Sequence, residues 1–137
     1  MAENTVAAFF YGLYMDENIL HGKGINPRMP KKVVVPGFRL RIGAKAFLSP
    51  QFGAQAFGMV YSLTHAELHA LYAGSGLDMY KQEAVLALFE DGSSGAVVTF
   101  NLTIPPSSQE SNPDYASKLR VVLKRLDFPN DYIEAVV

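Results

Sequence analysis

The stretch of sequence that decides the fold is TVAAFFYGLYM, residues 5–15. Its first part, Thr5–Tyr11, is mostly apolar, aromatic and β-branched, which predicts a buried strand. Gly12 ends this run, and the residues after it suit a loop or a short helix. Because the strand stops abruptly at a glycine, successive backbone N–H groups can face one point and bind a carboxylate or an oxyanion. The alternative, that Gly12 merely permits a tight turn, is equally open.

Further strands are predicted from hydrophobic alternation along the chain. In residues 38–42 the arginines Arg39 and Arg41 alternate with apolar residues, so they face away from the core. The Asp91-Gly92 pair indicates a hairpin between two strands. The expected segments are an extended run over Lys32–Leu48 broken at Pro36-Gly37, a turn at Ser49–Gly53, and strands over Gln55–Leu63, Tyr80–Phe89 and Ala96–Leu102.

Three helical segments are predicted from caps and spacing. Thr64 and Glu67 have the spacing of a capping box, which starts a short helix. Apolar residues at helical spacing predict a helix over Asp114–Leu126, and a last helical turn is expected over Tyr132–Val137. The order of strands, helix, hairpin and helices indicates an α+β fold, and the length of 137 residues indicates one domain spanning residues 1–137.

Composition excludes several classes of protein. With 49% hydrophobic and 18% charged residues, the chain is typical of a packed globule rather than a disordered protein. It has no cysteine, so disulfides, thiol catalysis and cysteine-based zinc sites are excluded. No apolar run is long enough to span a bilayer, and the acidic Glu3 before the first apolar run is unlike a signal peptide. We therefore expect a cytoplasmic protein, either a monomer or a homodimer.

Charge is distributed unevenly along the chain. Residues 18–66 contain seven basic and no acidic side chains, whereas residues 67–115 contain seven acidic side chains and Lys81 as the one base. We expect opposite charges to pair across neighbouring strands. The sequence pI of about 6.3 is far from the basic value typical of nucleic-acid-binding domains, and no basic amphipathic helix is visible. Neither a nucleic acid nor a membrane is an expected partner.

Metal and cofactor motifs are absent from the sequence. His65 and His69 lie four residues apart on one face of the predicted helix, and His21 is the one further histidine. This pattern lacks the glutamate placement of the metalloprotease motif, so a solvated helix face is the favoured interpretation. No phosphate-binding loop or dinucleotide fingerprint occurs. We expect neither a metal nor a cofactor.

Several motifs, in order, resemble the gamma-glutamylcyclotransferase-like superfamily. Tyr11-Gly12-Leu13-Tyr14 is similar to the family's Tyr-Gly signature at the end of its first strand. The other similar segments are Pro36–Leu40, Phe57–Leu63, Asp78–Tyr80, Asn112–Tyr115 and Leu126–Tyr132. The resemblance covers nearly the whole chain. It implies a small mixed β-barrel with flanking helices.

The resemblance also implies a reaction. Family members cleave gamma-glutamyl peptides or amines: the α-amine attacks the γ-carbonyl, and 5-oxoproline is released. The glycine loop holds the substrate, which here assigns ligand binding to Tyr11, Gly12, Leu13, Tyr14 and Met15, with Tyr80 beside them. A glutamate in an L-D-x-x-E segment transfers the proton from the attacking amine to the leaving nitrogen, and such chemistry needs a titratable group.

This chain departs from the family at that glutamate. Leu71-Tyr72-Ala73-Gly74-Ser75 takes the place of L-D-x-x-E, so Ser75 stands at the catalytic position. A serine hydroxyl without a base of its own cannot take over the proton transfer. Asp78 and Glu83 are the nearest acids in the sequence. If Tyr80 points into the pocket, strand alternation sends Glu83 to the other face, which leaves Asp78 as the possible substitute acid.

Three functions follow as hypotheses. The first is a divergent family member that binds a small amino-acid-like or amine-bearing ligand at the 11–15 loop without the usual cyclotransferase activity. The second is an active gamma-glutamyl cyclotransferase or gamma-glutamylamine lyase with a relocated acid. The third is a protein-interaction scaffold, since a fold does not determine a function.

Overall fold

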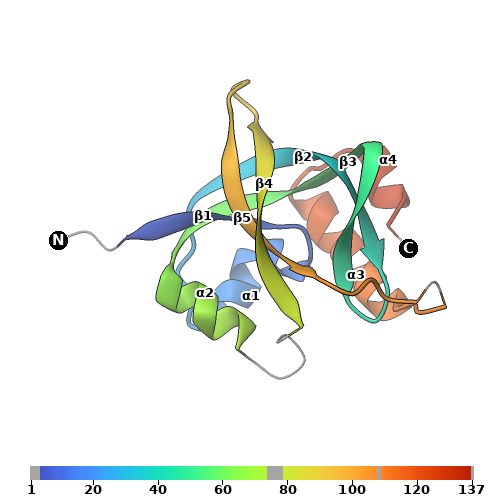
Figure 1. The fold of residues 1–137 in the computed structure, drawn as a ribbon, viewed down its shortest axis with the longest axis horizontal. Helices are drawn as coiled ribbons and strands as arrows, with labels where there is room; N and C mark the ends of the chain where they lie inside the picture. The colour runs from blue at the N-terminus through green and yellow to red at the C-terminus, as the bar shows by residue number, and fades with distance from the viewer. Residues whose placement is uncertain (1–3, 74–78, 108, 137) are drawn as a thin grey trace.

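Five strands close into a barrel, in the order β1–β3–β2–β4–β5, in the computed structural model of residues 4–73, 79–107 and 109–136 (Figure 1). β1 pairs with β5 in parallel, and the remaining neighbours are antiparallel, so the barrel is mixed. The strands are β1 (Thr5–Phe10), β2 (Arg28–Ile42), β3 (Ala46–Thr64), β4 (Tyr80–Phe89) and β5 (Ser94–Leu102). The predicted α+β fold with a small mixed barrel is confirmed.

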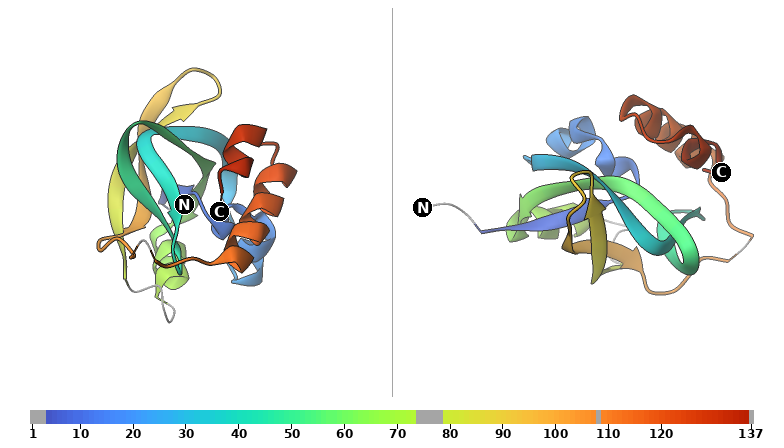
Figure 2. Two further views of the ribbon diagram at one scale, coloured as in Figure 1. Left: turned by 90° about the vertical axis from the view of Figure 1, so that its right-hand side faces the viewer. Right: turned by 90° about the horizontal axis from the view of Figure 1, so that it is seen from above.

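Short helices flank the barrel. α3 and α4 lie beside the arm formed by β2 and β3 (Figure 2), and α1 and α2 lie nearer the end of β1 from which the chain enters. None of the helices in the described residues is long and apolar enough to cross a membrane. The helices are η1 (Leu13–Met15, a 3₁₀ turn), α1 (Glu17–Gly22), α2 (His65–Tyr72), α3 (Pro113–Arg125) and α4 (Asn130–Glu134).

Two hydrophobic clusters result from the alternation of side chains along the strands. Phe9 of β1 and Tyr11 directly after it belong to the cluster inside the barrel, while Ala8 and Phe10 of β1 belong to the cluster between the barrel and the helices. Leu119 and Leu123 of α3 are fully buried in the outer cluster. β1 therefore contributes to both cores, as its aromatic sequence predicts.

Side-chain hydrogen bonds complete the barrel where strand pairing is short. β1 and β5 pair at two positions only, and there the Thr99 hydroxyl donates to the Phe9 carbonyl at 2.9 Å. The Asn101 side chain reaches β3 and binds both backbone groups of Leu48, accepting its N–H at 2.9 Å and donating to its C=O at 2.8 Å. Both polar residues are buried. Their amide and hydroxyl groups thus replace missing rungs of the backbone ladder.

The predicted turn at Ser49–Gly53 is wrong. β3 runs through this segment, and the chain reverses instead at residues 43–45, where Ile42 pairs with Ala46. The glycine signal at the predicted turn marks a bulge: the register shifts between Pro36 and Phe38, and Gly37 and Gly53 both have positive φ. A bulge needs the same left-handed backbone as a turn, so composition alone does not separate them.

The turn at residues 43–45 is held by the loop that leads into α3. The Ala44 N–H donates to Glu110 Oε1 at 3.1 Å, and Asn112 Nδ2 donates to the Ala44 carbonyl at 3.0 Å. Gly43 packs against Pro106 so closely that an added Cβ would lie 2.7 Å from its ring. The β2–β3 hairpin and the segment between β5 and α3 are thus tied together at this turn.

Other expectations differ from the structure by small amounts. Arg39 and Arg41 are exposed and the apolar residues between them are partly buried, so the predicted alternation is confirmed. The strand pair around Asp91-Gly92 is also confirmed, with Gly92 at a φ of 90°. The last helix occupies Asn130–Glu134 rather than Tyr132–Val137, because Pro129 precedes its first turn.

The predicted capping box is present, and it links the two charge-biased segments of the chain. The Glu67 side chain accepts the N–H groups of Thr64 and Asn26 and binds the Arg28 guanidinium at 2.9 Å. Burial opposes ionisation of this carboxyl, but these three donors outweigh it and lower its pKa to about 2. A helix start, a loop and β2 are therefore joined by one carboxylate.

We expect Glu67→Gln to lower the free energy of unfolding by about 1 kcal/mol at neutral pH, because the amide keeps the cap but loses the charge. The folded pKa of Glu67 lies below its ordinary 4.5, so the stabilisation is complete above pH 4.5 and is lost as the pH falls towards 2. Urea titrations across this range should show the two proteins converging. An equal gap at every pH would contradict the assignment.

Candidate functional site

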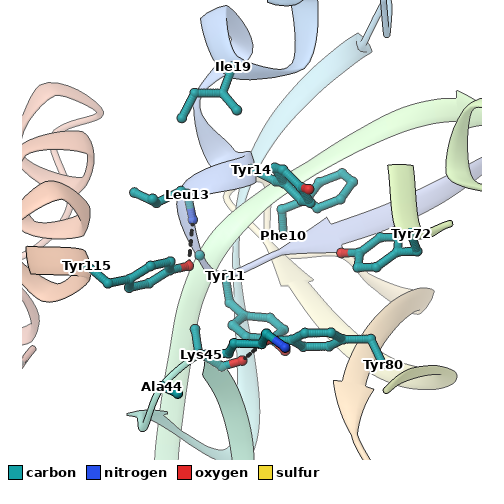
Figure 3. Close-up of a pocket in the computed structure, with 12 residues that line it drawn as sticks. Phe10, Tyr11, Leu13, Tyr14, Ile19, Ala44, Lys45, Tyr72, Tyr80 and Tyr115 are labelled. Carbon is teal, nitrogen blue, oxygen red and sulfur yellow. Dashed lines mark hydrogen bonds between the residues drawn. The ribbon is translucent and has the colours of Figure 1, made fainter. Parts of the chain in front are cut away.

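A cavity of about 240 Å³ opens where β1 ends (Figure 3). One wall is the segment from Phe10 to Tyr14, and the facing wall is the turn at residues 44–46. Tyr72 at the end of α2 and Tyr80 at the start of β4 close one side, and Tyr115 of α3 closes the other. Separate parts of the sequence, from β1 to α3, therefore meet at the loop that the sequence singled out.

Tyrosine hydroxyl groups bind the backbone around this cavity. Tyr11 donates to the Phe100 carbonyl at 2.7 Å, and Tyr80 donates to the Ala46 carbonyl at 2.5 Å. Tyr115 accepts the Leu13 N–H at 3.0 Å, which leaves its own hydroxyl hydrogen free to donate within the cavity. The first two tyrosines fix the walls, and the third presents a donor.

These phenols are neutral at physiological pH. Burial raises the pKa of Tyr11, Tyr72, Tyr80 and Tyr115, and neighbouring tyrosines raise it further, while the Leu13 N–H partly offsets the effect at Tyr115. Burial also raises the pKa of Tyr14. A neutral phenol donates a hydrogen bond but does not remove a proton from an amine.

Aromatic faces form one side of the cavity. Tyr72 stacks on Phe100 with ring centroids 4.0 Å apart and planes inclined by 16°. Tyr14 meets the same Tyr72 ring edge-on at 5.9 Å, and Tyr80 lies 6.0 Å from it. Such a packed set of rings is rigid and presents negative π-faces.

Gly12 is required for close approach, not for a special backbone angle. Its φ is −114°, which other residues adopt readily. A Cβ at this position, however, would lie 2.3 Å from the Tyr115 hydroxyl oxygen. The Leu13 N–H that the anion-binding hypothesis places at the strand end is occupied by the same hydroxyl. The structure thus puts Tyr115 where the glycine loop would otherwise meet a ligand directly.

Five of the residues that the sequence assigned to ligand binding line the cavity, namely Tyr11, Gly12, Leu13, Tyr14 and Tyr80. Met15 does not line it. Its side chain is fully buried in the outer core, and its carbonyl accepts the Tyr61 hydroxyl at 2.6 Å. Ser75 and Asp78 lie outside the described residues.

Glu83 does not line the cavity, although Tyr80 does, as strand alternation predicts. Its carboxylate instead accepts the Asn101 side-chain N–H at 3.0 Å. His65 and His69 are exposed on α2. Within the described ranges no group of three histidine, aspartate or glutamate side chains is placed to hold a metal ion.

Sequence reasoning missed seven of the twelve described lining residues, and three of these seven, Lys45, Tyr72 and Tyr115, have polar side chains. Tyr72 lies in the segment compared with L-D-x-x-E, and Tyr115 belongs to the segment Asn112–Tyr115 that suggested the resemblance, so the sequence offered a signal for both. Lys45 has no motif around it. Lys45 is placed by the hairpin turn, whose position the sequence did not reveal. It is the one charged side chain among the described lining residues.

We expect Gly12→Ala to destabilise the protein by about 2 kcal/mol, because the new methyl group overlaps the Tyr115 hydroxyl. In a Tyr115→Phe background the same change should cost less than about 1 kcal/mol, since the colliding oxygen is gone. Gly22→Ala is the control, because a Cβ there meets nothing within 4 Å. Denaturant unfolding of the four variants measures the coupling, and additive costs would refute the contact.

Comparison with solved structures identifies the architecture. A structure of gamma-glutamyl cyclotransferase superposes with a TM-score of 0.77 at 18% identity, covering 98% of this chain and 89% of that one. YkqA from Bacillus subtilis gives a TM-score of 0.77 at 19% identity, covering 96% of this chain and 52% of that one. An AIG2-like protein from Mus musculus gives 0.59 at 14% identity, covering 82% and 91%.

Comparison at the level of sequence finds no match. No protein-family model and no curated protein matches the chain. The structural agreement extends over nearly the whole chain. The chain therefore has the fold of gamma-glutamyl cyclotransferase.

Proposed function

We propose that the cavity at the end of β1 binds a small amino-acid-like ligand, and that the protein lacks the usual cyclotransferase activity. The observation that carries this proposal is the composition of the lining. The described lining residues supply one ammonium group, several phenol donors and aromatic faces, but no carboxylate. Such a lining recognises a ligand without providing a base.

A carboxylate on the ligand has two partners in this cavity. Lys45 supplies the positive charge, and the Tyr115 hydroxyl supplies a neutral donor from the side of the cavity that α3 closes. Burial raises the pKa of Tyr115, so its hydrogen stays available for donation. A charged and a neutral donor from two different elements would orient the ligand as well as attract it.

An amine or an apolar group on the same ligand would bind at the aromatic side of the cavity. Tyr14, Tyr72 and Tyr80 surround this part, and a cation is attracted to their π-faces. A zwitterionic amino acid therefore fits the two sides in a defined orientation. The volume of about 240 Å³ suits a small molecule rather than a peptide or a protein surface.

We expect Lys45→Met to weaken binding of gamma-glutamylalanine by about tenfold or more, because a charge-assisted contact of about 1.5 kcal/mol or more is removed. Calorimetry or an NMR titration on the full chain measures this. Lys81→Met is the matched control, since Lys81 is exposed and does not line this cavity. Equal loss in both variants would mean that Lys45 contributes only net charge.

A second candidate function is supported by the fold match to gamma-glutamyl cyclotransferase. In that reaction the α-nitrogen forms a bond to the carbon of the γ-carbonyl, the bond from this carbonyl carbon to the leaving nitrogen breaks, and a proton passes from the first nitrogen to the second. Among the acids considered, Glu83 is engaged with Asn101, so this candidate depends on Asp78.

We expect no release of 5-oxoproline from gamma-glutamyl dipeptides or gamma-glutamyl amines by the wild-type protein. We expect Ser75→Glu to produce it, because it places a carboxylate at the family's catalytic position. Release by the wild type that is lost in Asp78→Asn would establish the second candidate instead. Binding without release would leave the binding function standing alone.

A further inference from the structure

A second cavity, of about 530 Å³, is lined in part by Glu110 and Asn112, the residues that hold the 43–45 turn. It is a groove between the outer edge of the β2 arm and helices α3 and α4, whose proximity is visible in Figures 1 and 2. Three arginines from two elements line it, Arg39 and Arg41 of β2 and Arg120 of α3. We call it the arginine groove.

Arg39 and Arg41 are available to a ligand. They stand two residues apart on β2, so their side chains leave the same face of the strand. Both are exposed, and neither forms an ion pair or a hydrogen bond in the described part of the chain. The expected pairing of basic and acidic segments therefore holds for Arg28 and Glu67 but not here.

Arg120 is fixed in place from the opposite wall. It is partly buried, its Nη1 donates to the Val136 carbonyl, and its Nη2 donates to the Ser117 hydroxyl at 3.1 Å. These two bonds use only part of the five N–H donors of a guanidinium group. The remaining donors belong to a group that is already ordered, so a ligand would cost less entropy to bind.

The carboxylate in the groove does not neutralise these arginines. Glu110 Oε1 accepts the Ala44 N–H at 3.1 Å, and Oε2 accepts the Ser107 N–H at 3.0 Å. Its two oxygens thus serve the backbone of the 43–45 turn and of the loop before α3. The described lining keeps a net charge of +2, from three guanidinium groups and one carboxylate.

We propose that the arginine groove binds a small anion carrying two or more negative charges, in the form of carboxylate or phosphate groups. Guanidinium groups recognise both through paired N–H donors, and Arg39 and Arg41 together match two such groups along the strand. The volume fits a small ligand, and the described lining of the groove shares no residue with the tyrosine-lined cavity.

The test is an NMR titration of the full chain with pyrophosphate and, separately, with citrate at low ionic strength. Amide shifts should concentrate at residues 39–42 and 110–120, and raising the salt should weaken binding. Arg39→Ala with Arg41→Ala should lower the affinity by about tenfold or more, since two charge-assisted contacts are lost. Preference for one anion would identify which group the site takes.

The matched control is Lys118→Ala with Lys124→Ala. This pair removes the same charge from exposed positions of α3 that do not line the groove, so its affinity should stay within about twofold of wild type. Arg39 and Arg41 bind no partner among residues 4–73, 79–107 and 109–136, so unchanged amide spectra should show that their variant is folded. Equal loss in both double variants, or no binding of either anion by the wild type, would overturn the proposal.

Discussion

Closure of the barrel is the constraint on which the rest of the structure depends. Five strands cannot all pair along their full lengths, and the contacts β1–β5 and β2–β4 amount to two paired positions each. Buried backbone groups left over at these seams must find other partners. At the β1–β5 seam Thr99 and Tyr11 supply them by binding Phe9 and Phe100, and Asn101 adds a link from β5 to Leu48 of β3. Tyr11 also precedes Gly12 and lines the cavity, so the hydrogen bond that helps to close the barrel also fixes one wall of the cavity.

The elements that the sequence predicted best are those specified by local chemistry. The capping box of Thr64 and Glu67, the hairpin at Asp91-Gly92 and the β4 boundaries depend on neighbours a few residues away. The sequence did not predict the turn at residues 43–45, because this turn depends on Glu110, Asn112 and Pro106, which lie far along the chain. A local pattern carries no information on such partners. The place of Lys45 in the cavity was not predicted for the same reason.

The candidate site illustrates the same division at the level of side chains. The 11–14 loop was found because a strand ending in glycine is a local signal, whereas Tyr115 reaches it from another part of the chain across 102 residues. The structural reason for a glycine at position 12 therefore comes from α3. The sequence suggested either a tight turn or an open nest of N–H groups, but the Tyr115 hydroxyl fills the space that a side chain would need. The glycine at the end of β1 thus makes room for a side chain of α3.

The tie between the 43–45 turn and the loop before α3 has an evolutionary consequence. Surface loops usually drift in length, because little depends on their path. Here Glu110 and Asn112 line the arginine groove while holding Ala44, which lines the tyrosine cavity. An insertion or a deletion between β5 and α3 would therefore disturb both cavities at once. Among related sequences, the length of this segment should vary less than that of the Asp91-Gly92 hairpin, and changes in the two cavities should be inherited together.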